Sequence, residues 1–259
     1  ITRKVIYLKD LDYALIEANE VQVFCSDGSQ VQRETVLVSA SPGLINKGGY
    51  RHFMEKEICE QPDSIANTIA AMTGVDGRIS VGISQEVLKN ISGIVMLAAG
   101  TSHIASLVAR YWIEKIAKIS VSCELASEYH YREPVTNGLN TVIAISQSGE
   151  SLDTLKAMNY AAKRNLFTIA LVNVTDSTIA READTVLLTK AGPEIGVAST
   201  KAFTAQLTVL LSLAIAIAEA KNEITLDYSD ELQGKIRLLP GLVGKALDGF
   251  EIIKPIASK

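Results

Sequence analysis

The sequence predicts a layered α/β fold, with helices covering both faces of a parallel sheet, and a small β unit ahead of it. From residue 92 onward, short apolar runs alternate with helical patterns, which is typical of parallel strands joined by helices. These runs are apolar at consecutive positions, as expected of strands that are buried on both faces. Residues 1–45 instead contain short strand-like segments separated by turn residues.

The N-terminal segment predicts a hairpin. Residues 21–25 and 31–36 have strand composition and flank a turn that contains Asp27 and Gly28, a pair that tolerates positive φ. An isolated hairpin is only marginally stable in water. Because the chain also starts without Met, we expect residues 1–45 to be the end of a larger domain, and the chain to be an internal piece of a longer protein.

A linker and helix are predicted next, over residues 46–76. Gly48 and Gly49 mark a boundary. Apolar residues then recur at helical spacing, at Ile58, Ile65, Ile69 and Met72.

The α/β segment is expected to span residues 77–225. Its strands are predicted at residues 94–98, 119–121, 141–145, 168–172 and 185–188, and its helices at 101–117, 152–163 and about 199–220. The most apolar stretch, residues 207–218, is too short to cross a membrane, so we expect a buried helix. The tail spans residues 226–259. Within it, residues 227–249 are predicted to be a helix pair broken at Pro240 and Gly241, and no closing element is recognised after them.

Composition narrows the possible functions. A chain of 259 residues, 47% of them hydrophobic, can bury one substantial core. Its net charge of -4 comes from interspersed charges, which argues against a nucleic-acid partner. The short apolar stretch at residues 207–218 argues against a membrane partner. Three distant cysteines give neither a disulfide framework nor a metal pattern, and His103 and His130 lack a second ligand nearby. We therefore expect a cytoplasmic protein without metal or cofactor.

Two polar loops follow predicted strands, where open parallel sheets bind ligands. Residues 100–102 place Thr101 and Ser102 after the first strand, and the second loop contains Ser146, Gln147, Ser148 and Ser151. A helix start offers free N–H groups and partial positive charge, so nearby hydroxyls can complete a phosphate site without lysine. The alternative is that these residues only cap helices. One cap needs one hydroxyl, so the second loop favours binding.

A third loop, residues 194–201, leaves both interpretations open. It either contacts a ligand or simply provides a Ser199 cap, with Lys201 on a solvated helix face. Glu124, Glu128 and Glu133 are irregularly spaced, which favours a solvated helix face over a catalytic pair.

Together the three loops resemble the sugar-isomerase (SIS) domain family, and within it the first such domain of the glucosamine-6-phosphate synthases. Two linker segments strengthen the resemblance, with Gly-Tyr-Arg-His-Phe-Met-Glu-Lys-Glu-Ile at residues 49–58 and Glu-Gln-Pro at 60–62. Ala99 departs from the Cys that related enzymes often have, and Ser151 from the frequent Thr.

The resemblance implies an organisation and an activity. Residues 1–45 would be the remnant of a glutaminase domain, 46–76 a linker and hinge helix, 77–225 the first SIS domain and 226–259 a helical inter-domain tail. The family transfers ammonia from glutamine to fructose 6-phosphate and forms glucosamine 6-phosphate. Its catalytic groups would lie outside this chain, which would bind a phosphorylated hexose, without a cofactor, in a homodimer.

The resemblance also implies roles for individual residues. Ser146, Gln147, Ser148 and Ser151 would bind the phosphate. Thr101, Ser102 and the Val197 backbone would lie near sugar hydroxyls. Two other functions remain open: a regulatory module that senses a phosphosugar, which has no reason to carry the linker, and a free-standing phosphosugar isomerase, which needs an acid/base pair that we cannot assign.

Overall fold

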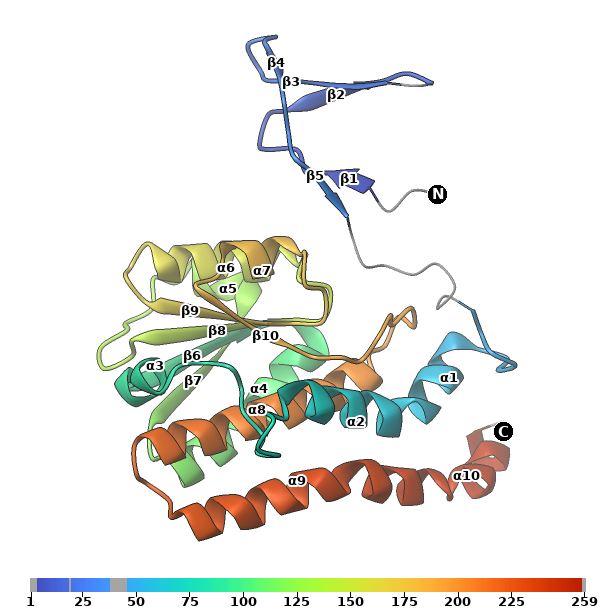
Figure 1. The fold of residues 1–259 in the computed structure, drawn as a ribbon, viewed down its shortest axis with the longest axis vertical. Helices are drawn as coiled ribbons and strands as arrows, with labels where there is room; N and C mark the ends of the chain where they lie inside the picture. Colours follow the sequence, from blue (N-terminus) through green and yellow to red (C-terminus); the bar gives the residue numbers. More distant parts are fainter. Residues whose placement is uncertain (1–3, 19, 38–45, 258–259) are drawn as a thin grey trace. The chain divides into compact units, whose positions relative to one another are not determined.

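A computed structural model describes residues 4–18, 20–37 and 46–257 (Figure 1). The chain divides into two compact units, Ile1–Asn46 and Lys47–Lys259. The finer division into four segments stays a prediction.

The N-terminal unit contains two small antiparallel sheets. In one, β1 (Lys4–Ile6) pairs with β5 (Thr35–Leu37), and the other has the order β2 (Tyr13–Ile16), β3 (Val21–Phe24), β4 (Gln30–Val31). The predicted hairpin is confirmed between β3 and β4, with Gly28 at φ 82° in its turn. Its second strand is shorter than expected, because Thr35 and the residues after it pair with β1 instead.

The second unit is built on a five-stranded parallel sheet. Its order is β10 (Thr185–Leu188), β9 (Phe167–Val172), β8 (Thr141–Ser146), β6 (Gly93–Ala98), β7 (Ser120–Leu125). Every neighbouring pair is parallel. Ala98 lies opposite Ile145, so the loops after β6 and β8 leave the sheet side by side. The predicted fold class is confirmed.

Helices cover both faces of this sheet (Figure 1). On one face lie α4 (Gly100–Ala117) and α8 (Lys201–Ala220), and on the other lie α5 (Ala126–Tyr129), α6 (Leu152–Ala162) and α7 (Thr178–Glu182). A short helix, α3 (Gln85–Asn90), precedes β6. Along β6, Ile94 and Met96 belong to the core under α8, whereas Val95 and Leu97 belong to the core under α6. This alternation explains why the strand is apolar throughout.

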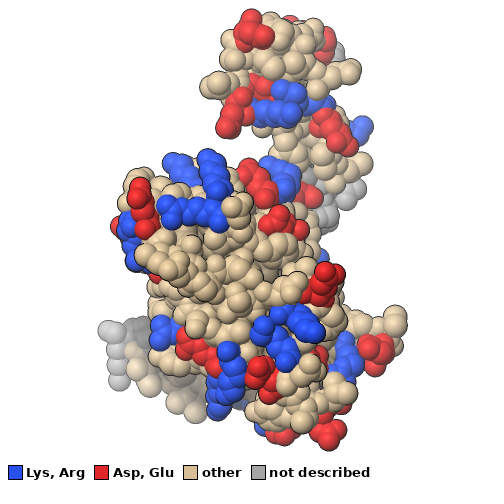
Figure 2. Space-filling model, turned by 90° about the vertical axis from the view of Figure 1, so that its left-hand side faces the viewer, with Lys and Arg blue, Asp and Glu red and all other residues tan. Residues whose placement is uncertain are grey.

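Helix α8 is confirmed as a buried core helix. Among the described helices it alone is long and apolar enough to cross a membrane, but 72% of its apolar window is buried inside the domain. On the face shown in Figure 2, acidic and basic side chains are interspersed over most of the surface.

Helix α2 (Gln61–Met72) packs with α9 (Leu226–Leu247) beside α8. Helix α1 (Phe53–Cys59) precedes α2, and α10 (Phe250–Ala257) follows α9. The expected break at Pro240 is wrong, because α9 continues through it. Buried Ile236 and the partly buried Leu239 and Val243 pack in the α2–α9 cluster on both sides of the proline, and this packing overrides the local cost of the proline. The sequence analysis also missed α10.

Replacing Ile143 by Ala should test the role of the sheet core. Ile143 is fully buried in the central strand β8, so truncation leaves a cavity and should lower the free energy of unfolding by about 2–5 kcal/mol. Urea unfolding measures this loss. Val135→Ala, at an exposed position, is the control and should change stability little.

Candidate functional site

The loop after β6 places two predicted site residues at the start of α4. Thr101 is exposed, and Ser102 is 8% exposed. Gln206 of α8 donates a hydrogen bond from Nε2 to Ser102 Oγ at 3.0 Å. The N-cap residue of α4, Ala99, makes no side-chain cap bond. Neither hydroxyl therefore serves as the N-cap of this helix, and Ser102 is held by a neighbouring helix.

The loop after β8 uses its serine oxygens to fix its own turn. The Gly149 N–H donates to Ser146 Oγ at 3.0 Å, and the Glu150 N–H donates to Ser148 Oγ at 3.2 Å. Thr154 Oγ1 donates to Ser151 Oγ at 3.1 Å. Ser151 is the N-cap residue of α6 but makes no side-chain cap bond. Ordinary helix capping thus does not account for these serines.

Gly149 is required by the geometry of this loop. Its φ is +68°, and a Cβ at this position would lie 2.0 Å from Ser177 Oγ. The Ile179 N–H donates to the Gly149 carbonyl at 3.0 Å. Glu150 accepts a 2.8 Å bond from the Thr178 N–H. The loop is therefore pinned against the start of α7 with little freedom to move.

Asn173, at the end of β9, connects two of the loops. Its N–H donates to the Gln147 carbonyl at 3.1 Å, and its Nδ2 donates to the Gly192 carbonyl at 2.9 Å. Its Oδ1 accepts from the Ala191 N–H at 3.0 Å. The sequence analysis missed this residue, although its position directly after a predicted strand was a usable signal.

The third loop contradicts the predicted Ser199 cap and the predicted solvated Lys201, whereas its contact with a ligand stays a prediction. Glu194, rather than Ser199, satisfies the start of α8, accepting from the N–H groups of Thr200 at 2.9 Å and Ala202 at 3.2 Å. Ser199 Oγ donates to the same carboxylate at 2.8 Å. Lys201 is not solvated: it is 4% exposed and its Nζ lies 2.7 Å from Glu60 Oε2. A carboxylate therefore already occupies this helix N-terminus.

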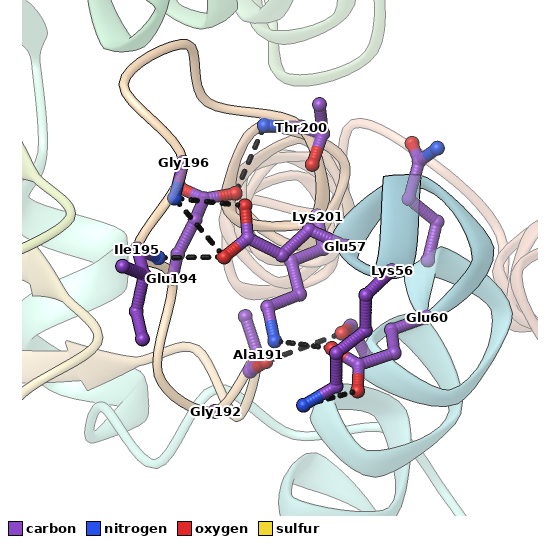
Figure 3. Close-up of polar contacts among 12 residues, drawn as sticks. Lys56, Glu57, Glu60, Ala191, Gly192, Glu194, Ile195, Gly196, Thr200 and Lys201 are labelled. Atoms are coloured by element: carbon purple, nitrogen blue, oxygen red, sulfur yellow. Dashed lines mark hydrogen bonds and ion pairs between the residues drawn. The ribbon is translucent and has the colours of Figure 1, made fainter. Parts of the chain in front are cut away.

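Glu57 of α1 also holds this loop (Figure 3). Its side chain is 2% exposed. It accepts from the N–H groups of Ile195 at 2.6 Å and of Gly196 at 3.1 Å. Val197 follows directly and is fully exposed. The sequence analysis did not single out Glu57, because nothing local marks a glutamate that is buried by a loop far along the chain.

Metal-ligating side chains do not cluster among the described residues. In the part of the chain that the structure describes, no group of three His, Cys, Asp or Glu residues could hold a metal ion. The predicted helix face of Glu124, Glu128 and Glu133 is wrong for two of its members. Glu124 lies in β7 and pairs with Arg132, and Glu133 lies beyond the end of α5 with a φ of 48°.

Gly149→Ala should disrupt the loop after β8. The substitution combines a positive φ with the contact to Ser177, so we expect a loss of roughly 2 kcal/mol or more in the free energy of unfolding. Gly244→Ala is a matched control, since Gly244 lies inside α9 with no atom near its missing Cβ. It should instead stabilise the protein by about 0.5–1 kcal/mol. Thermal unfolding of both variants measures the contrast, and equal effects would contradict it.

Comparison with known proteins places this geometry in a family. The SIS domain family model matches residues 88–216. The glutamine–fructose-6-phosphate aminotransferase of Bradyrhizobium diazoefficiens is 44% identical over 248 residues, covering 95% of this chain and 41% of the relative. That of Clostridium tetani is 41% identical over 261 residues, covering 100% of this chain and 43% of the relative.

A solved structure agrees with these relatives. The C-terminal domain of glucosamine-fructose-6-phosphate aminotransferase from Francisella tularensis matches with a TM-score of 0.79 and 41% identity, covering 82% of this chain and 60% of that one. The chain spans about two fifths of the length of the curated relatives it matches. It therefore belongs to the SIS-domain family, and over nearly its whole length it is a homologue of the glutamine–fructose-6-phosphate aminotransferases.

Proposed function

We propose that this chain binds a phosphorylated hexose, fructose 6-phosphate or glucosamine 6-phosphate, at the carboxyl edge of its parallel sheet. The observation that carries the proposal is the loop of residues 146–151, which crowds three serines at the start of α6 without using Ser151 as a side-chain cap. The names of the relatives, which are fructose-6-phosphate aminotransferases, support this choice of ligand.

The start of α6 suits a phosphate dianion better than the start of α8. Both helices begin with N–H groups that have no partner within the helix, at the positive end of the helix dipole. At α8 these donors are bonded to the carboxylate of Glu194, so a second anion there would meet a like charge. At α6 the N-cap is the neutral Ser151, with Ser148 exposed nearby in the chain, and the acidic residue of the first turn, Asp153, accepts none of the described hydrogen bonds from the helix start. We assign the phosphate to Ser146, Gln147, Ser148 and Ser151.

The sugar would extend from this phosphate toward the neighbouring loops. Because β6 and β8 are adjacent and in register at Ala98 and Ile145, Thr101 and Ser102 emerge beside the serine loop. Asn173 ties that loop to the segment that leads to Val197. Hydroxyls and backbone groups of this kind recognise sugar hydroxyls through hydrogen bonds.

We further propose that the chain is the sugar-phosphate-binding part of an aminotransferase that converts fructose 6-phosphate and glutamine to glucosamine 6-phosphate and glutamate. No catalytic residue is assigned within it, and the catalytic groups would belong to the rest of a longer protein. We expect a cytoplasmic homodimer. A regulatory SIS module or a free-standing isomerase is less well supported, since the relatives match the linker and the N-terminal unit as well as the SIS domain.

Ser148→Ala tests the proposed site. The side chain is exposed and its oxygen accepts only from the neighbouring Glu150 N–H among the bonds described, so its removal should spare the fold. Loss of a charge-assisted hydrogen bond should weaken fructose 6-phosphate binding by about 1–3 kcal/mol, measured by calorimetry. Ser120→Ala, an exposed serine at the opposite end of the sheet, is the control. Unchanged affinity in the Ser148 variant would argue against this phosphate site.

A further inference from the structure

We propose that Glu57 is a positioning residue for the sugar site, acting through Gly196 to hold the loop that presents Val197. The inference rests on the proposed function, because it assigns this loop to the sugar rather than to the phosphate. It gives α1, the first helix after the linker, a role in ligand recognition although no residue of α1 belongs to the proposed binding set.

The contact is a buried carboxylate bonded to backbone. Glu57 Oε1 accepts from Ile195 N at 2.6 Å and Gly196 N at 3.1 Å, and Oε2 also lies 3.1 Å from Gly196 N. Among the described residues, no Lys, Arg or His forms an ion pair with Glu57. Burying a charge is costly unless hydrogen bonds replace its lost water. The carboxylate is therefore stable in this place only while the loop keeps both N–H groups directed at it.

A second contact fixes the far end of the same loop. Lys201 Nζ lies 2.7 Å from Glu60 Oε2, and Glu60 also lies 3.4 Å from Lys56. Both Glu57 and Glu60 belong to α1 or its end. As Figure 3 shows, α1 thus contacts the loop at Gly196 and the helix start at Lys201. The exposed residue Val197 lies between these two anchors, so its backbone cannot relax independently of α1.

Because Gly196 has no side chain, the Glu57 carboxylate can closely approach its backbone. A Cβ at this position would lie 2.5 Å from Glu57 Oε2. Gly196 is not among the glycines with positive φ, so alanine is otherwise compatible with its backbone. The contact with Glu57 is what requires glycine here. Gly196→Ala should therefore displace the carboxylate and have the same consequence as removing its charge.

The experiment is a double-mutant cycle on the whole 259-residue chain, with Glu57→Gln, Gly196→Ala and the double variant. Fructose 6-phosphate and inorganic phosphate are titrated separately, by calorimetry and by NMR. Each single variant should bind fructose 6-phosphate roughly tenfold more weakly, as expected for a lost hydrogen-bonding contact of about 1.4 kcal/mol. Binding of inorganic phosphate, which needs only the serine loop, should not change. The double variant should bind no more weakly than either single variant, because both break one contact.

Glu55→Gln is the matched control on the same helix. Glu55 contacts Arg51 and Lys254 rather than the loop, and this variant should bind both ligands normally. Melting temperatures identify variants that are merely unfolded, and Gly196→Ala keeps the test valid if Glu57→Gln does not fold.

Three outcomes would overturn the inference. Glu57 and Gly196 variants that bind fructose 6-phosphate as tightly as the wild type would remove the positioning role while leaving the proposed function intact. If the variants bound fructose 6-phosphate and inorganic phosphate equally weakly, Glu57 would contribute only to the general stability of the protein. A wild-type chain that binds no sugar phosphate would overturn the proposed function, and this inference with it.

Discussion

The structure depends on a parallel sheet that is buried on both faces. Side chains of the central strands alternate between two cores, so Met96 packs under α8 while Leu97 packs under α6. With apolar groups on both faces, polar chemistry is confined to the strand ends. The carboxyl ends of β6, β8, β9 and β10 lie at one edge because every pair is parallel. The candidate site is a consequence of this arrangement.

At that edge the backbone N–H groups at the helix N-termini have different surroundings. Glu194 neutralises the N-terminus of α8 with its own carboxylate, whereas α6 begins at the uncharged Ser151. Two helices of the same sheet therefore differ in their capacity to receive an anion. This difference favours phosphate binding at the start of α6 and sugar binding at the loop before α8.

Helix α1 holds the loop before α8 through its acidic side chains. A buried glutamate on α1 and a buried lysine on α8 join segments about 140 residues apart in the sequence. Buried polar contacts of this kind favour one loop arrangement, because every alternative leaves a charge or N–H group without a partner.

The sequence alone determined the fold class, the strands of the sheet and the three loops, because runs of apolar residues and their punctuation are local properties. Tertiary structure decided the rest. Packing of residues on both sides of Pro240 keeps α9 continuous through the proline. Glu194, instead of Ser199, accepts the hydrogen bonds from the start of α8. Tertiary structure also buried Glu57 and Lys201. Their partners are remote in the sequence, so no local pattern could distinguish them from solvated charges on a helix surface.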